Sequence, residues 1–201
     1  MSQSFNKIMS SVWVGLLFVV LVIAGAEKSE ARTVLVMGDS LSDAYRLPKE
    51  VGWVYQLQQA LEPDTSVVNA SISGETSAGG ALRLPSLLET HEPDVVMIIL
   101  GGNDGLRALH PNQLMGYLSQ MIELSLDAGA RVGLMQIHLP PNLGPVYTER
   151  FEAVYPELAN RYDVMLVPFF LVDFFQEEGM IMDDGIHPTA KAQPLMYQSI
   201  R

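Results

Sequence analysis

The chain of 201 residues contains no cysteine. This absence excludes disulfide bonds, a cysteine nucleophile and any metal site built from thiolates. Charged residues are also scarce, at 17% of the chain, whereas hydrophobic residues make up 48%. That balance excludes a chain kept disordered by its charge, and the length suits one compact domain with a substantial core.

Cationic side chains are few, since 12 Lys and Arg stand against 23 Asp and Glu and the formal net charge at pH 7 is −11. An acidic surface repels the phosphates of nucleic acids and the headgroups of anionic lipids. We therefore expect no nucleic-acid partner and no electrostatic docking on an anionic membrane.

A long uncharged stretch occupies residues 8–26, after Lys7. A basic residue, an apolar run and a small-x-small ending, here Ala24-Gly25-Ala26, are typical of a secretory signal peptide. We predict a cleaved signal peptide at residues 1–26, and a mature domain at residues 27–201 that is periplasmic or secreted without stable membrane insertion. An uncleaved anchor stays an alternative, because the stretch approaches the roughly 20 residues that span a bilayer.

Five short apolar runs alternate with longer stretches of helical spacing. Their near-continuous hydrophobicity is typical of parallel strands that are covered on both faces. The runs lie at residues 33–37, 66–69, 95–100, 132–137 and 164–167. Helices are expected at residues 51–61, 77–89, 113–128 and 149–161, and a last one opens at Pro188. This alternation predicts a three-layer α/β/α sandwich with a five-stranded parallel sheet of flavodoxin-like order 2-1-3-4-5.

Ser40 directly follows the first strand in the string GDSLS, and His187 lies in the string DGIHP with Asp184 three residues before it. A serine hydroxyl becomes a nucleophile when a histidine takes its proton, and a carboxylate fixes the tautomer of that histidine. The three residues predict a serine hydrolase. Helix capping by Ser40 or Ser42 is the structural alternative, and Asp183 is the competing carboxylate.

Two further groups follow strands of the predicted sheet, at the edge where ligands bind in open α/β folds. The amide of Gly74, after the second strand, could bind an oxyanion, although a capping box at residues 73–76 explains the same string. Asn103 lies in the string GGND after the third strand, where glycines permit close backbone approach and the side-chain amide is a donor. A plain turn is the alternative there.

The other three histidines fit other positions. His91 lies near an expected helix end, His110 precedes a proline, and His138 follows the fourth strand with no carboxylate within four positions to orient it. The acidic pair beside His187 lacks a second histidine at ligand spacing, so we expect no metal and no other cofactor.

In this order, the strings around Ser40, Gly74, Asn103 and His187 resemble the four blocks of the SGNH hydrolases, also called GDSL esterases, over nearly all of the mature chain. The strings NASISGETS at 69–77, LGGNDGLR at 100–107 and DDGIHP at 183–188 are similar to the bacterial periplasmic thioesterase I and arylesterase branch. The resemblance also implies a closing helix longer than the chain supplies before Arg201.

The resemblance implies a role for each site residue. Ser40 would be the nucleophile, His187 the base and Asp184 its orienter. The oxyanion donors would be the amides of Ser40 and Gly74 and the side chain of Asn103. The loop at residues 105–111 would cover the acyl chain, with Leu106 and Leu109 as apolar contacts.

The implied activity is hydrolysis of small acyl esters and thioesters through an acyl-enzyme, as in arylesterases, acyl-CoA thioesterases and lysophospholipases. A carbohydrate O-acetyl esterase on the same fold is one alternative, and it would need a shallower, polar cleft. A non-catalytic flavodoxin-like binding domain is the alternative from another class, and it predicts no covalent chemistry at Ser40. The string GDSLS also lacks the second glycine of the G-x-S-x-G elbow, which disfavours the α/β-hydrolase fold.

Overall fold

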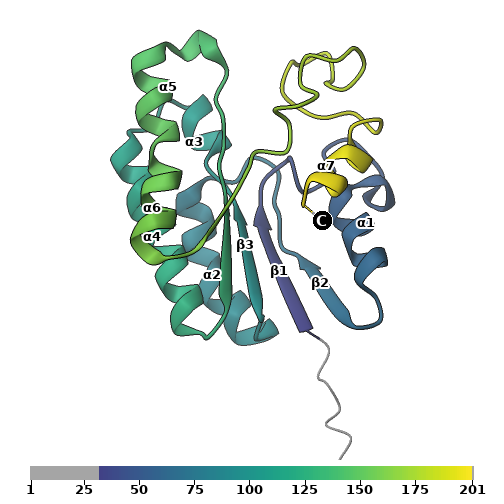
Figure 1. The fold of residues 1–201 in the computed structure, drawn as a ribbon, viewed down its shortest axis with the longest axis vertical. Coiled ribbons are helices and arrows are strands. Elements are labelled where there is room, and N and C mark those ends of the chain that lie inside the picture. Colours follow the sequence, from purple (N-terminus) through teal and green to yellow (C-terminus); the bar gives the residue numbers. More distant parts are fainter. Residues whose placement is uncertain (1–31, 201) are drawn as a thin grey trace, which may run out of the picture. The chain divides into compact units, whose positions relative to one another are not determined.

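The computed structural model describes residues 32–200, and the predicted signal peptide lies outside the described residues. The described chain forms a five-stranded parallel sheet with helices on both faces (Figure 1). The strands are β1 (Arg32–Gly38), β2 (Thr65–Asn69), β3 (Val95–Ile99), β4 (Arg131–Met135) and β5 (Met165–Val167). Their order, β2-β1-β3-β4-β5, confirms the predicted fold class.

The middle strands β1, β3 and β4 come from nearly continuous apolar runs because helices cover both of their faces. Val34 of β1 pairs with Val67 of β2 on one side and with Val95 of β3 on the other. Leu35 and Ile98, from neighbouring strands, are both fully buried. Burial on both faces removes polar alternation from the middle of these strands, whereas Ser66 and Asn69 of the edge strand β2 are exposed.

Helices α1 (Trp53–Leu61) and α7 (Gln193–Ile200) cover one face of the sheet, and α2 (Ser77–His91), α4 (Pro111–Asp127) and α6 (Val154–Tyr162) cover the other (Figure 1). Shorter elements complete the fold. They are α3 (Gly102–Leu106), α5 (Pro145–Glu152) and the 3-10 helices η1 (Lys49–Val51) and η2 (Pro141–Leu143). Within residues 32–200, no helix combines the length and apolar character that crossing a membrane requires.

Two helix predictions were wrong in detail. The single helix expected at residues 149–161 is two helices, α5 and α6, which meet at Ala153. Pro156 lies in the first turn of α6 and has no N–H to donate to the carbonyl four residues earlier, so the helical hydrogen bonds are interrupted there.

The closing helix begins at Gln193 rather than at Pro188. Pro188 instead forms an antiparallel bridge with Ile181, and the Thr189 amide donates to the Met180 carbonyl at 2.8 Å. These contacts hold the chain extended past Pro188 and delay the helix.

Candidate active site

Ser40 lies in a series of turns that begins where β1 ends. The amides of Ser42 and Asp43 donate to the Asp39 carbonyl at 3.1 and 3.0 Å and close the first turn. A Cβ at Gly38 would lie 2.7 Å from the Ser42 hydroxyl oxygen, so glycine allows this tight packing. No helix starts here, because the next one, η1, begins at Lys49. The helix-capping alternative for Ser40 and Ser42 is therefore wrong.

The Ser40 hydroxyl lies next to the imidazole of His187, although the two residues are 147 positions apart. Ser40 Oγ is 2.9 Å from His187 Nε2. On the other side of the ring, His187 Nδ1 is 2.8 Å from Asp184 Oδ2. Asp184, rather than Asp183, is thus the carboxylate at this ring. The three side chains form a continuous chain from carboxylate to hydroxyl.

The second oxygen of Asp184 is also engaged. Asp184 Oδ1 accepts the backbone N–H groups of Ile186 at 3.0 Å and of His187 at 2.9 Å. The His187 N–H is the main reason that the pKa of Asp184 falls to about 2. Asp184 therefore stays ionised at any pH at which His187 can act as a base.

Gly74 lies between β2 and α2 with φ +82°, a backbone conformation that side chains disfavour. Its carbonyl accepts a hydrogen bond from Arg107 Nη2 at 3.1 Å, which ties this turn to the end of α3. Within residues 32–200, neither the Gly74 amide nor the Ser40 amide donates to another protein group. Both amides therefore remain available as donors.

The capping-box alternative for this turn is wrong. Thr76 is the N-cap of α2, and its side chain accepts the Gly79 amide at 3.3 Å. The Ser73 hydroxyl donates instead to Asp43 at 2.7 Å. Ser73 thus holds the Gly74 turn against the turns that contain Ser40.

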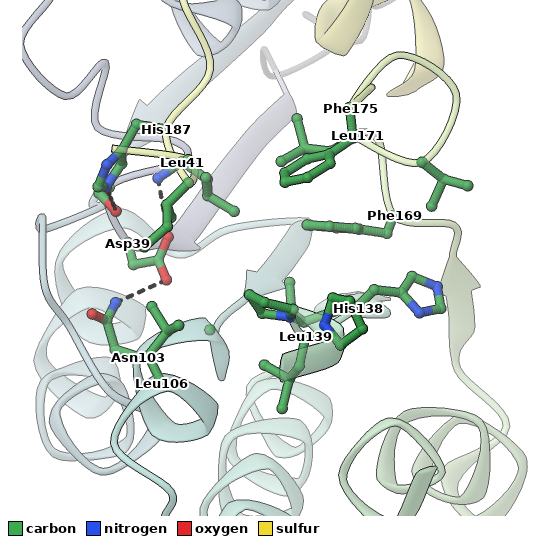
Figure 2. Close-up of a pocket in the computed structure, with 18 of the residues that line it drawn as sticks. Asp39, Leu41, Asn103, Leu106, His138, Leu139, Phe169, Leu171, Phe175 and His187 are labelled. Atoms are coloured by element: carbon green, nitrogen blue, oxygen red, sulfur yellow. Dashed lines mark hydrogen bonds between the residues drawn. The ribbon is translucent and has the colours of Figure 1, made fainter. Parts of the chain in front are cut away.

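Asn103 lies in the first turn of α3, where a plain turn was the alternative. Its side-chain Nδ2 donates to Asp39 Oδ2 at 3.0 Å (Figure 2). Because a side-chain amide carries two N–H donors, one remains free for a ligand. Asp39 Oδ1 accepts the Leu41 amide at 3.0 Å, so Asp39 joins the nucleophile turn to Asn103.

Asp39 has a positioning role that the sequence analysis missed. It is only 3% exposed, and this burial raises its pKa to about 6. The available signal was its place beside Ser40, at the carboxyl end of a central strand. The neighbouring Asp104 is also buried and accepts the Ser77 amide at 2.9 Å, which fixes α3 to the start of α2.

A cavity of about 390 Å³ opens beside Ser40 and His187. Its walls are mostly apolar (Figure 2) and come from α3, from the segment after β4 and from the segment after β5. The apolar side chains include Leu106, Leu139, Phe169, Leu171, Val172 and Phe175. The contribution after β5 was missed, although the string PFFLVDFF at 168–175 carries the signal.

Of the two predicted acyl contacts, Leu106 lines this cavity and Leu109 does not. The chain turns after α3 at Ala108, where φ is +52°. The Leu109 amide then donates back to the Asp104 carbonyl, and the Leu109 carbonyl accepts the Tyr147 hydroxyl at 2.7 Å. These bonds tie the Leu109 backbone to α3 and to Tyr147 of α5, and the residue stays outside the cavity lining.

His138 also lines the cavity, and its Nδ1 is 2.7 Å from Glu152 Oε2. The sequence analysis found no carboxylate near His138 because Glu152 is 14 positions away, on α5. The ring bonded to Ser40 is nevertheless that of His187. His91 ends α2, and His110 caps α4 by accepting the Asn112 amide. Residues 32–200 hold no group of three or more side chains placed to bind a metal ion.

Proteins similar to this chain include esterases and a thioesterase. The GDSL-like lipase/acylhydrolase family matches residues 36–194. An arylesterase of Vibrio mimicus is 45% identical over 178 residues, covering 87% of this chain and 89% of that protein. The thioesterase 1/protease 1/lysophospholipase L1 of Escherichia coli K12 is 45% identical over 179 residues, covering 89% and 86%. The psychrotrophic esterase EstA of Pseudoalteromonas sp., crystallised with monoethylphosphonate as inhibitor, has a TM-score of 0.80 at 38% identity, covering 84% and 94%.

Proposed function

The chain belongs to the GDSL-like lipase/acylhydrolase family and hydrolyses carboxylic esters and thioesters, and we propose that Ser40, His187 and Asp184 perform this reaction as a catalytic triad. The observation that carries the proposal is the 2.9 Å approach of Ser40 Oγ to His187 Nε2, with Asp184 on the opposite ring nitrogen. A nucleophile, a base and an orienting carboxylate within hydrogen-bonding reach are what acyl transfer to serine requires.

In the first half of the reaction, Ser40 Oγ attacks the substrate carbonyl carbon while His187 Nε2 accepts the hydroxyl proton. Asp184 holds the Nδ1–H tautomer and stabilises the imidazolium that forms. Collapse of the tetrahedral intermediate breaks the bond to the alcohol or thiol, which leaves with the proton from His187. Water then attacks the acyl-enzyme by the same route and releases the acid.

The negative charge on the carbonyl oxygen is met by three donors, the amides of Ser40 and Gly74 and the free N–H of the Asn103 side chain. Arg107 supports the Gly74 turn, and Asp39 supports the Asn103 amide. Donors fixed before the reaction do not need to reorganise as charge develops, which is why such sites lower the barrier.

The substrates of this site are acyl esters and thioesters of the aryl, acyl-CoA or lysophospholipid type. The cavity beside Ser40 supports this class, because its walls include Leu106, Leu139 and Phe175. Apolar walls favour a hydrocarbon chain over a sugar, so the carbohydrate O-acetyl esterase ranks second. Family membership rules out the non-catalytic binding domain.

Export completes the proposal. The sequence supports a signal peptide at residues 1–26 and a mature domain at residues 27–201 in the periplasm or outside the cell. In that location, esters and lysophospholipids are more accessible substrates than acyl-CoA, which is cytosolic. Mass spectrometry of the protein purified from the periplasm of a Gram-negative host would give the first residue of the mature chain.

The triad is tested with Ser40→Ala and the matched control Ser42→Ala, which removes a neighbouring hydroxyl that is buried without a hydrogen-bond partner. We expect Ser40→Ala to lose turnover of p-nitrophenyl esters by a factor on the order of 10⁶, because the nucleophile is gone. A fluorophosphonate should label the parent and Ser42→Ala at Ser40, and leave Ser40→Ala unlabelled. Parent-like turnover by Ser40→Ala would disprove the assignment.

A further inference from the structure

The ring of Tyr45 stacks on the imidazole of His187, with centroids 4.0 Å apart and planes inclined by 30°. We propose that Tyr45 is a positioning residue, whose ring holds the His187 imidazole in the orientation that reaches Ser40. This inference rests on the proposed triad and adds a fourth side chain that acts through His187.

The hydrogen bonds of His187 do not by themselves fix the tilt of its imidazole ring, so contact with a face of the ring is needed. The bonds to Ser40 and Asp184 are made by the two ring nitrogens, so they act along the plane of the ring. A tilt of the ring about the line between these partners is opposed weakly by such bonds, whereas contact with a ring face opposes it directly. Tyr45 supplies that contact.

The backbone of His187 is held by hydrogen bonds, so the tilt of the imidazole ring is the freedom that remains for a side chain to restrict. His187 lies between β5 and α7, where its N–H donates to Asp184 Oδ1 at 2.9 Å and its carbonyl accepts the Met182 amide at 2.8 Å. His187 also lines the cavity, so part of its surface is open to the substrate. Tyr45 does not line the cavity and so reaches the reaction only through His187.

Tyr45 itself is presented by a constrained turn. The residues on either side, Ala44 and Arg46, have φ of +54° and +56°, in the left-handed region that residues other than glycine seldom adopt. Ala44 is 5% exposed, and its carbonyl accepts the Leu47 amide at 2.9 Å. Strained conformations of this kind persist where the surroundings fix them, and they cluster at functional sites.

The aromatic face, rather than the hydroxyl, makes the contact. Within the described chain the Tyr45 hydroxyl has no hydrogen-bond partner. The guanidinium of Arg46 lies 5.1 Å from the centroid of the Tyr45 ring and adds a cation–π contact to the ring. Phenylalanine at this position should therefore preserve the function, and an aliphatic side chain should not.

The test compares Tyr45→Leu and Tyr45→Phe with the parent, using Tyr117→Leu on α4 as a matched control at an exposed tyrosine. We expect Tyr45→Leu to lower kcat for p-nitrophenyl butyrate about tenfold and to leave KM unchanged, because the base is misplaced while the cavity is intact. The rate of labelling by a fluorophosphonate should fall by the same factor. Tyr45→Phe and Tyr117→Leu should match the parent.

A parent-like kcat in Tyr45→Leu would overturn the proposal, and so would an equal loss in Tyr45→Phe, since that result would assign the role to the hydroxyl. If Tyr45→Leu does not fold, the same measurements on Tyr45→Met decide, because methionine fills the space without an aromatic face. Failure of the triad itself would show separately, as activity that survives in Ser40→Ala.

Discussion

Asp39 is a buried carboxylate that accepts hydrogen bonds from Asn103 and from the Leu41 amide. It is almost fully buried, and burial raises its pKa from 3.8 to about 6. Between these pH values the unfolded chain has released a proton that the native chain keeps. Stability therefore falls as pH rises from about 3.8 to about 6, by about 3 kcal/mol from this group. In return for this loss of stability, Asp39 accepts the hydrogen bond that orients the Asn103 side-chain amide.

Asp39→Asn should separate stability from activity. Without an ionisable group at this position, the variant should not lose stability as pH rises. Its free energy of unfolding relative to that of the parent should therefore increase by about 3 kcal/mol from pH 4 to pH 7. Its kcat should fall on the order of 10²–10³-fold. The Asp39 carboxylate only accepts hydrogen bonds, whereas a carboxamide also donates them, so the Asn103 side chain would no longer be held with its free N–H toward the oxyanion. Urea unfolding at a series of pH values, together with ester hydrolysis, measures both effects.

The control for this prediction is Asp127→Asn, which removes an exposed carboxylate at the end of α4. Its stability curve should run parallel to that of the parent over the same pH range. A parallel curve for Asp39→Asn as well would show that Asp39 bears no burial cost, and a parent-like kcat would show that it does not position Asn103.

At the scale of elements, the connection between β3 and α3 depends on Gly101. Its φ is +122°, and a Cβ there would lie 2.0 Å from the hydroxyl oxygen of Tyr155. That hydroxyl is buried and donates to the Leu100 carbonyl at 3.0 Å, so it cannot move without losing a hydrogen bond. The GGND string is thus a packing requirement for α6 as well as the support of Asn103.

Gly101→Ala should destabilise the protein by about 3 kcal/mol or more, through backbone strain and through displacement of Tyr155. Gly116→Ala is the matched change, since Gly116 lies in the middle of α4 and its added Cβ would meet nothing within 4 Å. That variant should be more stable by about 0.5–1 kcal/mol. Thermal and urea unfolding of both variants test the prediction, and equal shifts of the two would contradict it.

The elements themselves were largely predictable, because buried parallel strands leave continuous apolar runs and each of the five runs became a strand. Three details differed from the prediction. The β-bridge at Pro188 delays α7 through a contact that local patterns do not carry, whereas Pro156, which divides the expected fourth helix, was a local signal that the prediction overlooked. The GGND string, for which a plain turn was the alternative, begins the short helix α3.

The site was predictable where its residues lie in short strings and unpredictable where it is assembled in space. The resemblance to the SGNH hydrolases is confirmed by the family match. The pairing of His138 with Glu152 was missed because the partners lie on different elements. The stack of Tyr45 on His187 was missed for the same reason, since 142 positions of chain separate residues that only the folded sheet edge brings together.

At the scale of the whole molecule, an excess of acidic residues gives the chain a net negative charge, while the cavity beside Ser40 is mostly apolar. The formal net charge is −11, whereas the cavity beside Ser40 is lined largely by uncharged side chains. An acidic field does not affect a neutral ester, but it repels a substrate that carries phosphates. We therefore expect the net charge to favour neutral esters over acyl-CoA without any contact in the site.

Ionic strength should reveal this selection. For octanoyl-CoA, raising the salt concentration from 0.01 to 0.15 M shortens the Debye length from about 30 Å to about 8 Å and screens the repulsion, so kcat/KM should rise several-fold. For p-nitrophenyl octanoate, which has the same acyl chain and no charge, kcat/KM should stay constant. Steady-state assays of both substrates in one salt series make the comparison, because any effect of salt on the triad would change both. A flat profile for octanoyl-CoA would mean that the field at the cavity mouth is set by a few local side chains, and that the net charge plays no part in choosing the substrate.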